Sequence, residues 1–358
     1  VSWIIPEKDL SKDEIEIQEK IFMLGVAQGI NFFFPSGDWG SSSTPTIKGL
    51  KDPIPFYPST SPYVTSVGGT QIKYENGKYR EIAWGGIKGN YTYGSGGGYS
   101  NFFDRPSYQS IISFKRGFPD VAYNAAQESG YIVYLNGKIK IGYGTSLGAP
   151  QWAGINALIN QLNNENIGFI NLYLYKIYDN KEIYSKVFND ITEGYNGLYS
   201  AKEGWDPVTG LGTPNVYNLA YSIIRKEEKS LAILTNSSIK IKVYINNTET
   251  YIPTNIFFKD SIYIKIEINK TYTDNEIRYI YLETKGEINT SENTILVFIN
   301  KTSSLMILFK KQYLVFIDSE YYSKKEWYDA NSYVNIKIPK YLKVSDKEIL
   351  KFKNIEGL

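Results

Sequence analysis

The chain has 358 residues, of which 42% are hydrophobic and 21% are charged, and its formal net charge is +2 at pH 7; this length and composition suit about two globular domains, and the charge gives no sign of a nucleic-acid partner. The sequence contains neither cysteine nor histidine, which excludes disulfides, cysteine nucleophiles, thiolate or imidazole metal sites, and a Ser-His-Asp triad built from this chain alone. Any acid–base chemistry of its own near neutral or acid pH must therefore use carboxylates.

The first residues, 1–5, form a short apolar stretch that is typical of a strand inside a larger fold. They carry no basic n-region and no apolar signal core, so they do not indicate a signal peptide. We therefore expect the chain to be a fragment or a processed product of a longer protein. No run of residues approaches the roughly 20 apolar residues that a membrane-spanning helix needs, so no transmembrane segment is expected.

A helix is predicted after this stretch, capped by Ser11 or Asp13 and ended by Gly29. Its expected apolar side contains Ile15, Ile21, Phe22, Leu24 and Val26. Its acidic residues are interpreted as solvated or amphipathic-face charges, namely Glu14, Glu16 and Glu19.

Strands and helices continue to alternate up to about residue 225. A buried strand is expected just before the Ser-Gly-Asp turn that ends at Asp38. A further strand is expected near 61–72, and a long helix is expected over 150–163. This order predicts an α/β fold with a parallel sheet covered by helices on both faces.

From about Lys229 onward, short and evenly spaced segments alternate apolar and polar residues. Such alternation predicts an antiparallel β-sandwich, and the charged segment 225–230 is the expected linker. The predicted domains are therefore an α/β core at 1–228, a β-sandwich-like domain at 229–305, and a small β module or continuation at 306–358.

Ser146 lies between a glycine-rich turn and the apolar run of the long helix, in the segment IGYGTSLGAPQWAG. A serine at this place could simply cap the helix. It could also be a nucleophile, because the small residues around it let a substrate backbone approach and a helix N-terminus can direct its amides at an oxyanion.

Asp38 follows the buried strand in the segment FFFPSGDWGS. Its simplest interpretation is the carboxylate of an Asx turn. A protonated Asp38 beside Ser146 could instead donate a hydrogen bond to a developing oxyanion, whereas an ionised one would repel it. Asp120, in the segment RGFPDVA, is expected to be a buried structural carboxylate.

Two loops complete the candidate sites. The glycine-rich loop GSGGGYS could consist of tight turns, or it could form a wall of the substrate cleft, where bare backbone pairs with an extended peptide. The residues predicted for that wall are Ser95, Gly96, Gly97 and Gly98. The loop 189–212 has many turn residues, but its carboxylates and carbonyls are also the oxygen ligands that calcium requires.

Six segments occur in a fixed order: SGDWG, SPYVTSVGGT, SGGGYSNFFDRPSYQ, RGFPDVAYNA, GTSLGAPQWAG, and FNDITEG followed by GWDPVTGLGTP. Over about residues 1–225 they resemble the sedolisins, the serine-carboxyl peptidases, which have a subtilisin-like fold. The resemblance implies a serine nucleophile that is activated by a glutamate with an aspartate behind it. It matches Ser146 to the nucleophile and Asp38 to the aspartate of the oxyanion hole.

The same resemblance implies one structural calcium ion. Its ligands would be the side chains of Asp190 and Asp206 and the carbonyl oxygens of Ile191, Lys202 and Gly204. Lys202 stands where the family usually has glycine, a change that a carbonyl ligand tolerates if the backbone angle allows it.

The chain departs from the family pattern at the general base. In sedolisins the catalytic glutamate and its partner aspartate lie on a helix before the strand that resembles residues 1–5. We therefore expect this pair to lie outside the chain, in an upstream segment or a separate docked chain, and we expect the chain alone to be inactive. Otherwise the protein would be a relative that keeps Ser146 without its base.

These observations predict a secreted, acid-acting serine-carboxyl endopeptidase whose substrates are proteins or peptides. A non-catalytic peptide-binding or cell-surface protein on the same scaffold is the alternative, and a subtilisin-type protease would need a histidine upstream. An extracellular location is favoured by six Asn-x-Ser/Thr sequons, five of them in the β-rich part: Asn90, Asn236, Asn246, Asn269, Asn289 and Asn300. The final β segments also resemble repeats that end many archaeal surface proteins.

Overall fold

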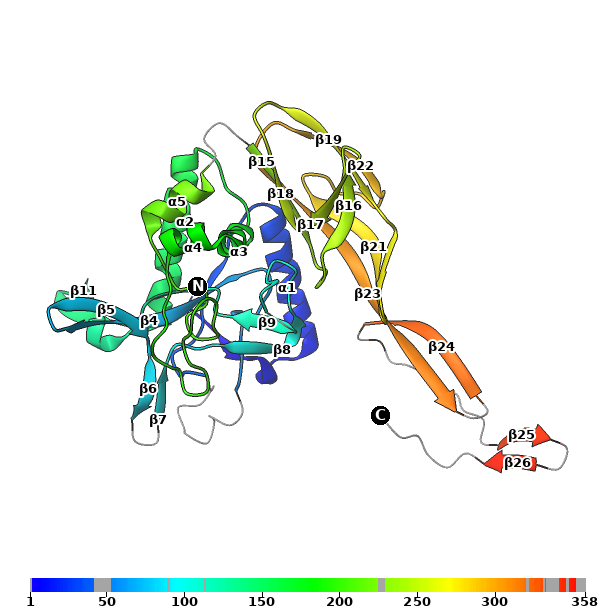
Figure 1. Cartoon of the computed structure of the whole chain (residues 1–358), viewed down its shortest axis with the longest axis horizontal. Coiled ribbons are helices and arrows are strands. Elements are labelled where there is room, and N and C mark those ends of the chain that lie inside the picture. Colours follow the sequence, from blue (N-terminus) through cyan, green and yellow to red (C-terminus); the bar gives the residue numbers. More distant parts are fainter. Residues whose placement is uncertain are drawn as a thin grey trace. The chain divides into compact units, whose positions relative to one another are not determined.

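The computed structural model describes residues 2–41, 53–88, 91–112, 114–224, 229–319, 322–330, 332, 341–345 and 348–351 (Figure 1). The chain divides into two compact units, one of Val1–Ile268 and Glu283–Leu308 and the other of Asn269–Leu282 and Phe309–Leu358. We call residues 2–224 the α/β region and residues 229–351 the β-rich region. No helix among the described residues is long and apolar enough to cross a membrane.

The α/β region is built on a sheet that contains three parallel strands. β2 (Phe33–Pro35) pairs with β4 (Thr65–Glu75), and β4 pairs with β10 (Val121–Asn124), both in parallel. β5 (Lys78–Ala83) adds to the second half of β4 in the antiparallel direction. The first half of β4 is continuously buried, as expected for a strand that is covered on both faces. The predicted parallel sheet is confirmed.

Helices pack on both faces of this sheet. Phe33 and Phe34 are neighbours on β2 and therefore point to opposite faces. Phe33 packs in one core cluster with Trp152 of α2 (Thr145–Asn163), and Phe34 packs in another with Phe22 of α1 (Lys12–Ala27). The cluster on the α2 face also includes residues of α3 (Asn171–Asp179), α4 (Lys181–Val187) and α5 (Val216–Ile223).

Helix α1 begins as the sequence predicts, because Ser11 caps it. The Ser11 side chain accepts a hydrogen bond from the Glu14 backbone N–H, and the Glu14 side chain accepts one in return from the Ser11 backbone. Its apolar side is narrower than predicted. Ile15, Phe22 and Val26 are buried, whereas Ile21 and Leu24 are 59% and 44% exposed.

Glu19 of α1 corrects a prediction, because it faces the protein interior and is not a solvated charge. The Tyr57 hydroxyl donates a 3.0 Å hydrogen bond to Glu19 Oε1. Burial raises the pKa of Glu19 to about 8, and the hydroxyl groups of Ser61 and Tyr57 only partly oppose this effect. Glu16, by contrast, is exposed as predicted.

Short antiparallel pairs extend from the α/β core. They are β1 (Ile5–Pro6) with β3 (Phe56–Tyr57), β6 (Gly85–Lys88) with β7 (Tyr91–Gly94), β8 (Gly98–Asp104) with β9 (Lys115–Phe118), β11 (Tyr131–Leu135) with β12 (Lys138–Gly142), and β13 (Phe188–Asn189) with β14 (Thr213–Pro214). The fully buried Glu7 fastens β8 to the start of the chain. It accepts hydrogen bonds from Ser100 Oγ at 2.6 Å and from the Asn101 N–H at 2.8 Å.

The β-rich region contains no helix among its described residues. One sheet has the strand order β17 (Thr248–Ile252), β16 (Ile241–Ile245), β19 (Ile262–Ile268), β22 (Thr294–Ile299). Another includes β18 (Thr254–Phe258), β15 (Lys229–Thr235), β23 (Ser303–Ser319), β21 (Ile277–Gly286), β20 (Thr271–Asp274) and β24 (Tyr322–Asp329). β25 (Tyr341–Ser345) pairs with β26 (Glu348–Lys351). In β22, buried and exposed residues alternate strictly, which confirms the period of two.

Within the first compact unit, the β-rich region packs against the α/β region. Leu234 and Met306 belong to the same buried cluster as Val26 of α1 and Leu172 of α3. Glu165 Oε2 accepts a 3.1 Å hydrogen bond from the backbone N–H of Thr302. The boundaries at 228 and 305 remain predictions about independently folding domains.

Candidate active site

Ser146 lies in the first turn of α2 and is not its cap. The helix begins at Thr145, five residues before the predicted start at Pro150, and its N-cap is Gly144, which has a positive φ of 101°. Pro150 has no N–H to donate to the carbonyl four residues earlier, which belongs to Ser146. That carbonyl instead accepts a 3.0 Å hydrogen bond from Ser2 Oγ. The Ser146 side chain is thus half-buried at a helix N-terminus.

Asp38 reaches the same helix N-terminus from the end of β2. Its Oδ1 accepts hydrogen bonds from both the backbone N–H and the hydroxyl of Thr145, each at 2.8 Å. The backbone N–H of Gly37 donates to the same Thr145 hydroxyl at 3.2 Å. The structure therefore brings Asp38 next to the residue that precedes Ser146, whereas its predicted role beside Ser146 itself stays a prediction.

Gly144 makes this approach possible. A Cβ atom at Gly144 would lie 2.6 Å from Asp38 Oδ2, and the φ of 101° is one that residues with a side chain rarely adopt. The Gly144 N–H is held by the carbonyl of Ala125 at 2.7 Å. The glycine that the motif places before Thr145 is therefore required for both space and backbone conformation.

No carboxylate is hydrogen-bonded to the Ser146 hydroxyl within the described part of the chain. The acidic residues of α1 are engaged elsewhere, since Glu14 closes the helix cap and Glu19 accepts from Tyr57. The arrangement of Ser146, Asp38 and the N-terminus of α2 can hold an anionic oxygen. It does not by itself contain a base for the serine.

Ser95, Gly96, Gly97 and Gly98 are all buried. Ser95 Oγ accepts from the Gly69 N–H at 2.9 Å and donates to the Val208 carbonyl at 2.7 Å. A Cβ at Gly96 would clash with the carbonyl of Ser36, and one at Gly97 with that of Pro207. Close packing behind the Asp38 turn is therefore one reason for these glycines, and their contact with a peptide stays a prediction.

Asp120 has the structural role that the sequence analysis assigned to it. It is fully buried and forms a 2.6 Å ion pair with Arg116, which is also fully buried. Its oxygens accept further hydrogen bonds from the Tyr175 hydroxyl at 2.7 Å and from the Ser66 N–H at 2.8 Å. These contacts hold β10 to β4 below the site.

The five predicted calcium ligands lie in the loop 189–212, which is held together by hydrogen bonds between its own residues. The Gly204 N–H donates to Asp190 Oδ2 at 2.8 Å, and the Lys202 N–H donates to Asp206 Oδ2 at 3.2 Å. Asp190 Oδ1 is buried and has no hydrogen-bond partner among the described residues. The carbonyl oxygens of Ile191, Lys202 and Gly204 likewise accept no hydrogen bond in the described part of the chain.

Burial raises the pKa of Asp206 to about 6, although four hydrogen bonds from Lys202, Val208 and Thr209 oppose the shift. Burial also raises the pKa of Asp190. Two desolvated carboxylates and three unpaired carbonyl oxygens fit a hard cation. No cluster of three acidic side chains that could hold a metal occurs among the described residues, so a cation here would depend on the carbonyls.

The α/β region is similar to known proteins of one family. No family model matches the sequence. Kumamolisin from Bacillus sp. (strain MN-32) is 35% identical over 234 residues, which cover 60% of this chain and 40% of kumamolisin. Sedolisin from Pseudomonas sp. (strain 101) is 31% identical over 229 residues, which cover 60% of this chain and 38% of sedolisin. Human tripeptidyl-peptidase 1 is 33% identical over 245 residues, which cover 60% of this chain and 41% of that protein.

The solved structure of Pseudomonas sedolisin, a serine-carboxyl proteinase in complex with two molecules of pseudo-iodotyrostatin, has the same fold over this part. Its TM-score is 0.56 at 29% identity, and the match covers 62% of this chain and 64% of that one. About 60% of the chain is therefore similar in sequence and fold to the sedolisin, kumamolisin and tripeptidyl-peptidase family. The chain spans about two fifths of the length of these curated relatives. The sedolisin-related part has the subtilisin-like fold that the sequence predicted.

Thr145 is the residue of this candidate site that the sequence analysis missed. It is fully buried and makes both hydrogen bonds that orient Asp38. The only sequence signal was its position in the GTS motif, directly before Ser146.

Proposed function

We propose that the sedolisin-related region is the nucleophile-bearing part of a serine-carboxyl endopeptidase that hydrolyses peptide bonds at acid pH. The observation that carries this proposal is the pair of hydrogen bonds between Asp38 and Thr145, which hold a carboxyl group beside the N-terminus of the helix that bears Ser146. A capping serine would not need a carboxyl group fixed at this point.

The roles of the residues follow from their positions. Ser146 Oγ would attack the scissile carbonyl carbon, and the carbonyl oxygen would become an oxyanion. The backbone N–H of Ser146 and the protonated side chain of Asp38 would donate hydrogen bonds to that oxygen. Because Asp38 can donate only in its protonated form, the mechanism favours acid conditions.

The general base would come from residues outside this chain. Ser146 has no carboxylate partner within the described residues, and a serine without a base loses several powers of ten in rate. A glutamate and an aspartate on a separate segment, either upstream or on a docked chain, would supply the base. By itself the chain would then be inactive as a peptidase.

We further propose that the loop 189–212 binds one structural calcium ion through Asp190, Asp206 and the carbonyl oxygens of Ile191, Lys202 and Gly204. The unpaired Asp190 Oδ1 and the three unpaired carbonyls support this proposal. The ion would neutralise two desolvated carboxylates and fix the loop. It would take no part in peptide hydrolysis.

We also propose that the protein acts outside the cell, with a β-sandwich-like appendage. The alternative is a non-catalytic peptide-binding or cell-surface protein on the same scaffold. A Glu-x-x-x-Asp helix encoded before Val1 would support the peptidase, and its absence would support the alternative.

The deciding experiment uses the protein that carries both this chain and the base-bearing segment. Ser146→Ala should reduce cleavage of an unstructured peptide at acid pH by several powers of ten. Ser185→Ala, an exposed serine on α4, is the matched control and should retain wild-type activity. Unchanged cleavage by the Ser146→Ala protein would overturn the assignment.

A further inference from the structure

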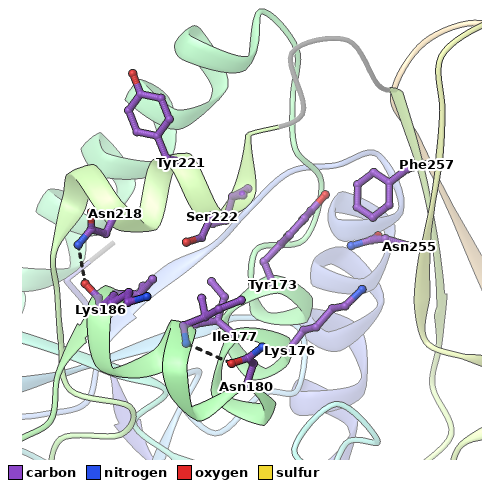
Figure 2. Close-up of a pocket in the computed structure, with 13 residues that line it drawn as sticks. Tyr173, Lys176, Ile177, Asn180, Lys186, Asn218, Tyr221, Ser222, Asn255 and Phe257 are labelled. Carbon is purple, nitrogen blue, oxygen red and sulfur yellow. Dashed lines mark hydrogen bonds between the residues drawn. The ribbon is translucent and has the colours of Figure 1, made fainter.

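A second cavity lies away from Ser146, within the first compact unit. It has a volume of about 540 Å³, opens to solvent, and is lined by residues of α3, α4, α5 and strand β18 of the β-rich region. This volume is within the range of small-molecule sites, roughly 300–1,000 Å³. Figure 2 shows the lining side chains converging from the helices on one side and from Asn255 and Phe257 on the other.

The walls of the cavity are apolar. Ile177, Val187 and Ile223 are at most 7% exposed and belong to the main core cluster, so they form a fixed wall. Phe257 is partly buried against the same cluster and forms part of the opposite side. These surfaces suit a hydrocarbon group of a ligand and give little to a purely polar one.

Lys176, Asn180 and Asn255 supply hydrogen-bond donors at the cavity. Lys176 has no ion pair within the described residues, and Figure 2 shows its side chain extending toward Asn255. In Asn255, Oδ1 is buried and has no partner among the described residues, and Figure 2 shows the amide nitrogen turned to the cavity. Asn180 uses its Oδ1 to accept from the Ile183 N–H, which leaves its amide N–H groups for another acceptor.

Charge in the cavity is positive. Among the described residues that line it, there are two lysines and no aspartate or glutamate. The second lysine, Lys186, is paired with Glu182 at 2.7 Å, so Lys176 is the lining lysine whose charge has no ion-pair partner in the described part of the chain. An anionic group on a ligand would therefore be attracted to Lys176, where an ammonium and a side-chain amide can both donate to it.

We propose that this cavity binds a monocarboxylate with an apolar body, with its carboxylate at Lys176 and Asn255 and its hydrocarbon part against Ile177, Val187 and Ile223. A fatty acid and the C-terminal end of a peptide that finishes in an apolar residue share this chemistry. The site is separate from Ser146, so the proposal does not rest on the peptidase function.

The test measures binding to the 358-residue chain by isothermal titration calorimetry. Octanoate represents the fatty acid and N-acetyl-leucine the peptide end; acetate and octan-1-ol control for the charge alone and the hydrocarbon alone. We expect octanoate or N-acetyl-leucine to bind, and acetate and octanol to bind at least about tenfold more weakly, because each lacks one half of the interaction. If octanoate binds more tightly than N-acetyl-leucine, the ligand is a fatty acid; if N-acetyl-leucine binds more tightly, it is the C-terminal end of a peptide.

Lys176→Met removes the charge and keeps the length of the side chain. It should weaken carboxylate binding about tenfold, the usual cost of losing a hydrogen bond between charged groups. Lys176→Arg should largely retain binding, and Lys20→Met, an exposed lysine on α1, should leave it unchanged. Thermal melts of the three variants check that each is folded.

Three results would overturn the proposal. The first is that neither octanoate nor N-acetyl-leucine binds at millimolar concentration. The second is that acetate binds as tightly as they do, because the apolar wall then plays no part. The third is that a folded Lys176→Met protein binds them as well as the unmodified chain.

Discussion

Asp38 and Thr145 are 107 residues apart in the sequence, yet Thr145 donates two 2.8 Å hydrogen bonds to a single carboxylate oxygen of Asp38. This contact joins the end of β2 to the first turn of α2. It fixes Asp38 Oδ1 and leaves Oδ2 as the oxygen that can form a hydrogen bond to a ligand. The geometry of the proposed oxyanion hole therefore depends on Thr145 as much as on Asp38.

Thr145→Val should lower kcat of the base-containing peptidase about tenfold, because it removes one of the two hydrogen bonds that orient Asp38. The value of KM should change little, since Thr145 is buried and does not reach a substrate. Thr145→Ser keeps the hydroxyl and should restore most of the activity. Steady-state kinetics at acid pH measure the effect. If Thr145→Val and wild type have equal kcat, Thr145 does not position Asp38.

Gly144→Ala should lower the free energy of unfolding by about 2 kcal/mol or more, since it adds a side chain at a positive φ and places a Cβ 2.6 Å from Asp38 Oδ2. Adding Asp38→Ala should recover part of this loss, because the carboxylate that clashes is gone. Gly154→Ala is the control, as its Cβ would meet nothing within 4 Å and should stabilise α2 by up to about 1 kcal/mol. Urea unfolding monitored by circular dichroism gives all three values. An unaffected Gly144→Ala protein would contradict the close approach of Asp38.

Calcium should raise the melting temperature of the chain, and EDTA should reverse the rise. At a concentration about 100-fold above its Kd, a bound ion stabilises a protein by about 2.7 kcal/mol. Asp190→Asn should abolish the calcium-dependent shift, because it removes the charge of a proposed ligand whose Oδ1 is buried and has no hydrogen-bond partner among the described residues. Asp179→Asn, an exposed residue at the end of α3, should keep the shift. A melting temperature that does not respond to calcium would argue against an ion at this loop.

The sequence predicted the parallel sheet, because strand patterns are local information, and the resemblance to the sedolisins implied that Asp38 lies near the GTS motif. It could not predict that Thr145 would hold Asp38, since that contact depends on how β2 and α2 pack. The same limit explains Glu19. The sequence pattern predicted that Glu19 lies on a helix. Its side chain faces the interior because Tyr57, 38 residues further along the chain, packs against that side of the helix.

The cavity at Lys176 could not be predicted from the sequence either. Its residues come from three helices and a strand that are separated by up to about 80 positions, and none of them forms a motif. Long-range packing creates the site, and the charge of Lys176 matters because no acidic side chain lines the cavity among the residues that the structure describes.

Glu19 should make the stability of the chain depend on pH. Its pKa is about 8 in the folded protein, against an ordinary value of 4.5. A carboxyl group with a raised pKa contributes its full stabilisation below the unfolded pKa and loses it as the pH rises toward the folded pKa. The contribution should therefore decline from about pH 4.5 to about pH 8, by an amount on the order of a few kcal/mol.

Glu19→Gln tests this dependence, because glutamine keeps the shape and the oxygen that accepts from Tyr57 but cannot ionise. Its free energy of unfolding should be close to that of wild type near pH 4.5 and should exceed it near pH 8. Urea titrations at several pH values, followed by tryptophan fluorescence, give the difference between the two proteins. Glu16→Gln, at an exposed position of the same helix, should differ from wild type by a small amount that does not vary with pH. If the Glu19→Gln difference is equally flat, Glu19 is ionised in the folded protein at neutral pH and its interior position does not shift its titration.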